Sequence, residues 1–199
     1  MLPDSARGSA GETLLTLMIA GLVFFLGIHL VPVAQPLRAR LLEQFGDKPY
    51  RGLFSLISAA GLALIVVGWH MRPERTQLFA PLAAARAAAP ALITIAFVLF
   101  AAANMKTHIR RIVVHPMLIG LLLWSGVHLL ANGDLAGTVL FGSFLAYSII
   151  ALVSAIQRHA VKAYTPAWKY DLMALAGGLA LSWLTIRFHP AVFATGPVT

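Results

Sequence analysis

The chain contains no cysteine among its 199 residues. This absence excludes disulfide bonds, thiolate catalysis, iron–sulfur clusters and a thiolate ligand to haem iron. Acidic residues are scarce as well, with 7 Asp and Glu in total. No two carboxylates share an apolar run, and the motifs HExxH, GxSxG and the P-loop are absent, so no hydrolytic apparatus is visible. Histidine is the strongest metal ligand that remains.

Hydrophobic residues make up 59% of the chain and charged residues 11%, and the mean hydropathy is +0.83. A soluble domain is nearer half apolar and about a quarter charged, so a soluble enzyme is excluded. The sequence predicts an all-α integral membrane protein, a bundle of about six transmembrane helices that forms a single domain over residues 1–199. The predicted spans are 13–34, 53–70, 88–105, 113–131, 135–156 and 171–188.

The 15 Lys and Arg residues exceed the 7 acidic residues and give a net charge of +8. No basic stripe with interleaved aromatic residues accompanies this charge, so nucleic acid is not an expected partner and the lipid bilayer is. Basic residues collect in cytoplasmic loops, which predicts that both termini are periplasmic in a bacterial inner membrane. The predicted inner loops hold Arg38, Arg40, Lys48, Arg51, Lys106, Arg110, Arg111, Arg158, Lys162 and Lys169.

Polar groups inside a predicted span are costly and are candidates for function. His29 interrupts an apolar run, where a neutral imidazole needs a hydrogen bond or a metal. One interpretation is a metal ligand, and the other is a histidine bonded to a neighbouring helix. His115 precedes Pro116 at the start of the fourth span, where a helix cap or an interface anchor is the simplest role.

The fourth predicted span carries a polar stripe. Trp124, His128 and Asn132 recur every four residues and share one helix face, and Ser125 lies one turn before His128 on the same side. The stripe is consistent with a cofactor pocket that has His128 as its ligand. It is equally consistent with close helix packing, which small residues such as Gly120 favour.

Two runs carry a family resemblance: GIHLVPVAQPLRARLLEQFGDKPYRGLFSLISAAGL and RRIVVHPMLIGLLLWSGVHLLANGD. They resemble the signatures of the NnrU family of small bacterial membrane proteins, most strongly over 15–165. That family is related to zeta-carotene isomerase, a membrane haem b protein in which two histidines are taken to ligate the iron. The family takes its name from an association with nitrite and nitric oxide reduction in denitrifiers.

The resemblance implies haem b held by His29 and His128, with Trp124, Ser125 and Asn132 in support. Ser125 stands where the isomerase has an alternative cysteine ligand, so a cysteine-dependent ligand switch is not implied. The implied partners are respiratory or nitrogen-oxide reductase components, and the implied substrate of an isomerase-like activity is a hydrophobic small molecule.

Depth in the membrane favours a different pair of ligands. With the N-terminus outside, His29 lies near the inner end of the first span and His128 near the outer end of the fourth. His115 lies at the inner level, 13 residues or roughly 20 Å of helix rise from His128. Because two axial ligands of one haem need similar depth, His115 is the rival of His128.

Two other functions stay open at this point. The segment around His115 also resembles the RHPxYxG element of isoprenylcysteine and phospholipid methyltransferases, although Val114 replaces its Arg and Leu118 its Tyr. A non-catalytic scaffold is the other alternative, in which small-residue faces pack a partner. The glycines of those faces are Gly61, Gly68, Gly120, Gly126, Gly177 and Gly178.

Overall fold

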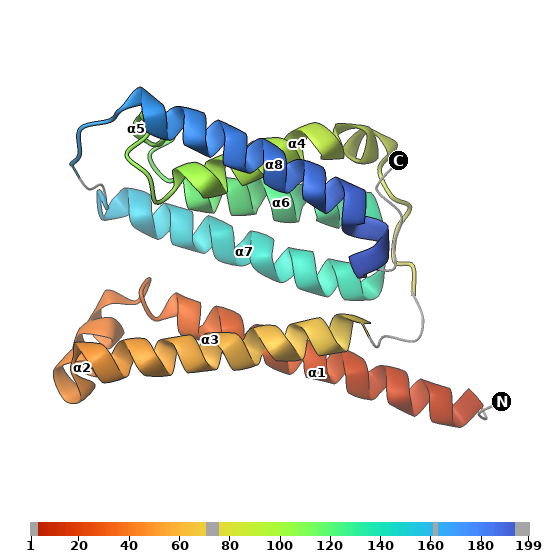
Figure 1. Cartoon of the computed structure of the whole chain (residues 1–199). Coiled ribbons are helices and arrows are strands. Elements are labelled where there is room, and N and C mark those ends of the chain that lie inside the picture. The colour runs from red at the N-terminus through yellow and green to blue at the C-terminus, as the bar shows by residue number, and fades with distance from the viewer. Residues whose placement is uncertain (1–3, 71–75, 161–162, 194–199) are drawn as a thin grey trace. The chain divides into compact units, whose positions relative to one another are not determined.

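The computed structural model describes residues 4–70, 76–160 and 163–193, and most of them are helical (Figure 1). No β-strand forms in these ranges, where Gln77 and Asp134 make an isolated bridge. This confirms the prediction of an all-α protein. The helices are α1 (Asp4–Leu30), α2 (Gln35–Phe45), α3 (Asp47–His70), α4 (Ala83–Ala102), α5 (His108–Val113), α6 (Pro116–Asn132), α7 (Leu135–Gln157) and α8 (Trp168–Phe193).

Within the described chain, 5 helices are long and apolar enough to cross a membrane, and α6 is a shorter apolar helix. The prediction of about six membrane helices is therefore confirmed. The long apolar segments are Thr13–Leu30, Asp47–His70, Ala83–Ala102, Leu135–Gln157 and Trp168–His189.

The helix ends differ from the predicted spans where polar residues continue or interrupt a helix. Helix α3 begins at Asp47 rather than at 53, because the polar residues before the apolar run are already helical. The fourth predicted span, 113–131, is divided between the short helix α5 and helix α6, which has Pro116 in its first turn. Helix α2 was not predicted, and it contains no buried residue.

The chain forms two compact units. The first contains Met1–Gln77 and Asp134–Ser143, and the second contains Leu78–Gly133 and Phe144–Thr199. Helix α7 contributes to both units. Helices α1, α2 and α3 belong to the first unit, and helices α4, α5, α6 and α8 to the second.

In the first unit, α1 packs along α3 through glycines (Figure 1). A Cβ atom on Gly61 would lie 2.7 Å from the backbone nitrogen of Phe25, and one on Gly68 would lie 2.7 Å from that of Met18. A Cβ on Gly21 would likewise lie 2.7 Å from the carbonyl oxygen of Gly61. Backbone therefore contacts backbone, which is the close approach that small residues allow between membrane helices.

In the second unit, α4 packs against both α6 and α8. A Cβ on Gly120 would lie 3.0 Å from the carbonyl oxygen of Ala96, and one on Gly178 would lie 2.5 Å from the Cα of Val98. Several glycines expected on partner-binding faces are thus used for packing inside the chain. They are Gly61, Gly68, Gly120 and Gly178.

A pair of hydroxyls joins α4 to α8. The oxygens of Thr94 and Ser182 are 2.6 Å apart, and Thr94 also donates to the carbonyl oxygen of Pro90 at 2.7 Å. Ser182 is buried. Interhelical hydrogen bonds of this kind help to hold membrane helices together, because lipid offers a polar group no partner.

Candidate functional site

His29 lies in the last turn of α1, among aromatic rings of the first unit. Its Nδ1 is 2.6 Å from the carbonyl oxygen of Phe25, one turn earlier in the same helix. Because a carbonyl only accepts, Nδ1 carries the proton and donates it, and Nε2 holds the lone pair. The ring centroid of His29 lies 4.3 Å from that of Phe25 and 5.0 Å from that of Phe54 on α3.

His128 lies near the end of α6 in the second unit and repeats this arrangement. Its Nδ1 donates to the carbonyl oxygen of Trp124 at 2.8 Å, so Nε2 again holds the lone pair. The ring centroids of Trp124 and His128 are 5.2 Å apart. Trp124 also packs against Phe144, at 5.5 Å between ring centroids, and against the buried cluster that contains Val127.

The same hydrogen bond, from Nδ1 to a carbonyl one turn earlier, also occurs at a histidine without a proposed function. His70, at the exposed end of α3, places Nδ1 2.9 Å from the carbonyl oxygen of Val66. The bond therefore fixes a tautomer but does not by itself mark a ligand. What distinguishes His29 and His128 is their partial burial beside aromatic rings.

The other two residues of the predicted polar stripe on α6, Ser125 and Asn132, have roles within the helix itself. Ser125 is completely buried, and its hydroxyl donates to the carbonyl oxygen of Leu121 at 2.7 Å within the same helix. Asn132 is the last residue of α6, and Gly133 follows it in the left-handed conformation with φ 71°. Ser125 is thus satisfied by its own helix, as serine in an apolar helix commonly is.

His115 occupies the N-cap position of α6, but its side chain makes no capping hydrogen bond. The predicted cap position is therefore confirmed, and the backbone carbonyl of His115 accepts from the N–H groups of Leu118 and Ile119. The preceding residue, Val114, has φ 58° and ψ −52°, and His115 donates its backbone N–H to Val113 at 2.6 Å. These values describe a γ-turn of the rare, strained kind, centred on a β-branched residue.

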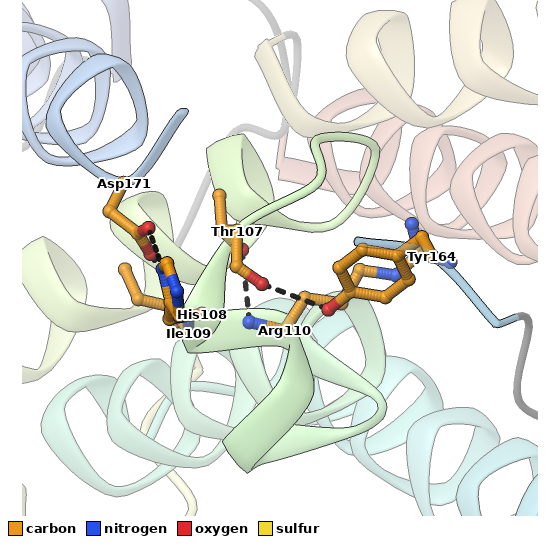
Figure 2. A network of polar contacts seen from close by, with 6 residues as sticks. All are labelled: Thr107, His108, Ile109, Arg110, Tyr164 and Asp171. Carbon is orange, nitrogen blue, oxygen red and sulfur yellow. Dashed lines mark hydrogen bonds and ion pairs between the residues drawn. The ribbon is translucent and has the colours of Figure 1, made fainter. Parts of the chain in front are cut away.

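A polar network that the sequence did not predict lies at the start of α5 and α8, in the second unit (Figure 2). His108 donates from Nδ1 to Asp171 at 2.7 Å, and the backbone N–H of Ile109 donates to the other carboxylate oxygen at 3.1 Å. The ring of Trp168 stacks on His108 with centroids 4.0 Å apart. Asp171 is buried, so its charge is compensated by these donors.

The next residues complete the network. Thr107 is fully buried and caps α5 by accepting from the backbone N–H of Arg110 at 2.9 Å. Its carbonyl oxygen accepts from the hydroxyl of Tyr164 at 2.9 Å, and the Arg110 guanidinium lies 5.0 Å from the Tyr164 ring centroid. His108 thus helps to fix α5 to the first turn of α8, and Tyr164 fixes the segment before α8 to Thr107.

The comparisons with known proteins decide the family. A family model described as NnrU protein matches residues 17–197. The chain belongs to the NnrU family. The NnrU match includes His29, His115 and His128, and it extends through α8, beyond the range 15–165 where the resemblance was expected to be strongest. No curated protein and no solved structure matches the chain.

Proposed function

We propose that this NnrU protein is a multi-pass protein of the bacterial inner membrane that binds haem b through His29 and His128. The observation that carries the proposal is the partial burial of both rings beside aromatic side chains, with each Nδ1 donating to a carbonyl oxygen one turn earlier, at 2.6 and 2.8 Å. Histidines that ligate metals almost always have their other ring nitrogen held by such a partner. Both imidazoles are thereby oriented with Nε2 as the ligand atom.

The surroundings of both histidines suit a flat, largely apolar macrocycle. Phe25 and Phe54 flank the ring of His29, and Trp124 flanks that of His128. The porphyrin supplies four nitrogen ligands, so one or two imidazoles complete the iron's coordination. Among the described residues, no three His, Cys, Asp or Glu side chains group as a metal cage. Bound haem supplies one-electron and ligand-binding chemistry, while this chain orients the imidazoles and excludes water.

The biological role that we propose follows from the family. Haem in this NnrU protein would support nitrite and nitric oxide reduction, in association with nitrogen-oxide reductase or other respiratory components. An isomerase-like reaction on a hydrophobic, lipid-phase substrate is the second form of the same proposal, because the related zeta-carotene isomerase is a haem b protein.

The test is an oxidised and reduced absorption spectrum of the detergent-purified protein, produced with ample haem. We expect a Soret band with sharp α and β bands in the reduced form, the signature of low-spin bis-histidine haem b. His29→Ala and His128→Ala should each abolish that low-spin spectrum. His70→Ala is the matched control, because His70 makes the same carbonyl bond at an exposed helix end, and its spectrum should be unchanged.

His115→Ala decides between the two ligand pairs. Loss of the low-spin spectrum in His115→Ala, with retention in His128→Ala, would replace His128 by its rival. A wild-type protein that stays colourless after haem titration would refute haem binding. Binding of S-adenosylmethionine or co-purification of a stable partner protein would then favour the methyltransferase or the scaffold, respectively.

A further inference from the structure

Two buried hydroxyls on α3 have no hydrogen-bond partner among the described residues. They are the Tyr50 Oη and the Ser58 Oγ. A buried hydroxyl without a partner loses its hydration and gains nothing in exchange, so native proteins contain few of them. A bound water molecule or a bound ligand is the usual explanation when one persists.

Both hydroxyls lie on the stripe of α3 that adjoins His29. Tyr50, Phe54 and Ser58 are spaced by four residues, which places them on one helix face. The Phe54 ring centroid is 5.0 Å from that of His29 and 6.3 Å from that of Tyr50. Phe54 therefore bridges His29 and Tyr50, and the two ring centroids are at most 5.0 + 6.3 = 11.3 Å apart.

Tyr50 and Ser58 differ in their position along the helix. Tyr50 is in the first turn of α3, at the polar end that begins at Asp47, whereas Ser58 is two turns further into the apolar segment. The rise between them is roughly 12 Å along the helix axis. A charged group of a ligand bound in the membrane is least costly near the lipid headgroups. Of the two hydroxyls, only that of Tyr50 lies at this level.

We propose that the Tyr50 hydroxyl donates a hydrogen bond to a propionate carboxylate of the haem held at His29. The inference rests on the proposed function and assigns the orientation of the haem, with its propionate edge toward the start of α3. A hydroxyl bonded to a carboxylate makes a short, charge-assisted bond, which is stronger than one to a neutral acceptor. The neighbouring Arg51 is exposed and already paired with Asp47 at 2.9 Å, so its charge is compensated outside the site.

The experiment is a titration of the haem-free full chain in detergent with hemin, for the wild type, Tyr50→Phe and Ser58→Ala. We expect Tyr50→Phe to weaken hemin binding about tenfold, because one charge-assisted hydrogen bond is lost. The melting temperature of the haem-free protein should stay the same or rise, because the unpartnered hydroxyl is removed. Ser58→Ala removes the other unpartnered hydroxyl of the same stripe, and its hemin affinity should be unchanged.

A haem analogue without free carboxylates tests whether the effect of Tyr50→Phe comes from the propionate. Iron protoporphyrin dimethyl ester has methyl esters in place of the two carboxylates, so the charge-assisted bond to Tyr50 cannot form. The tenfold difference between the wild type and Tyr50→Phe should therefore shrink toward none with this ligand, as in a double-mutant cycle.

The outcomes separate this inference from the proposed function. A wild type that binds hemin and a Tyr50→Phe variant that binds it equally well would overturn the role of Tyr50 and leave haem binding intact. Equal weakening in Tyr50→Phe and Ser58→Ala would also overturn it, because the effect would then be a general one on α3. A wild type that binds no hemin would overturn both proposals.

Discussion

The glycine contact between α1 and α3 makes a quantitative prediction for Gly61→Ala. The new Cβ would lie 2.7 Å from the backbone nitrogen of Phe25, whereas ordinary contact begins at 3.4 Å, so the helices must separate locally by about 3.4 − 2.7 = 0.7 Å. Adding a methyl group to a well-packed region costs about 1–3 kcal/mol. The same substitution gains about 1 kcal/mol of helix propensity, because alanine replaces glycine. We expect a net loss of up to about 2 kcal/mol.

Gly52→Ala is the matched control, because Gly52 lies on the same helix with nothing within 4 Å of its Cβ position. It gains the same helix propensity and meets no steric clash, so the difference between the two variants is the packing term alone. At about 2–4 °C per kcal/mol, a difference of about 1–3 kcal/mol corresponds to a Tm gap of roughly 2–12 °C. The assay is thermal unfolding in detergent by circular dichroism. Equal Tm values for the two variants would refute the backbone contact of α1 with α3.

Two further predictions concern the polar network and the orientation in the membrane. Asp171→Ala should destabilise the α5 region, seen as faster hydrogen exchange at 108–113, since the acceptor for His108 and Ile109 is lost. Asp171→Asn should lose less, and unchanged exchange in both variants would count against the network. For orientation, the absence of native cysteine allows single-cysteine labelling of intact cells with an impermeant maleimide. Gln77→Cys should react and Lys48→Cys should not; the reverse pattern would place both termini in the cytoplasm.

Hydropathy alone was sufficient to predict the number and order of the membrane helices, because each apolar run has to be long enough to cross the bilayer. It could not place their ends. The start of α3 at Asp47 and the separate helix α2 involve polar residues that are helical at the edge of the membrane. The break before Pro116 had a local signal, since proline favours a first helical turn, but the γ-turn at Val114 had none.

Contacts between distant residues could not be predicted from one sequence. His108 and Asp171 are 63 positions apart, and Thr94 and Ser182 are 88 apart, with no periodicity that relates one to the other. The sequence did contain a partial indication of the pair formed by His108 and Asp171. A lone carboxylate at the start of an apolar helix requires a partner if it is buried, and Asp171 is such a residue.

The candidate ligands show which part of a site a sequence can predict. A histidine in an apolar helix can satisfy one ring nitrogen with a carbonyl of its own helix, and His29, His70 and His128 all do so. That local bond requires no tertiary contact, so the tautomer follows from the helix alone. The surroundings of the ring do not follow from the helix alone, because Phe54 reaches His29 only when α1 and α3 approach closely.

The glycine contact and the histidine site are therefore physically coupled. Gly61 lies seven residues from Phe54 on α3, and it contacts Phe25, the residue whose carbonyl oxygen holds the Nδ1 proton of His29. A separation of the helices at Gly61 moves the Phe54 ring on α3 away from His29, while Phe25 and the Nδ1 bond stay with His29 in α1. If His29 ligates haem iron, Gly61→Ala should then weaken haem binding without changing the tautomer of the ligand, whereas Gly52→Ala should leave binding unchanged.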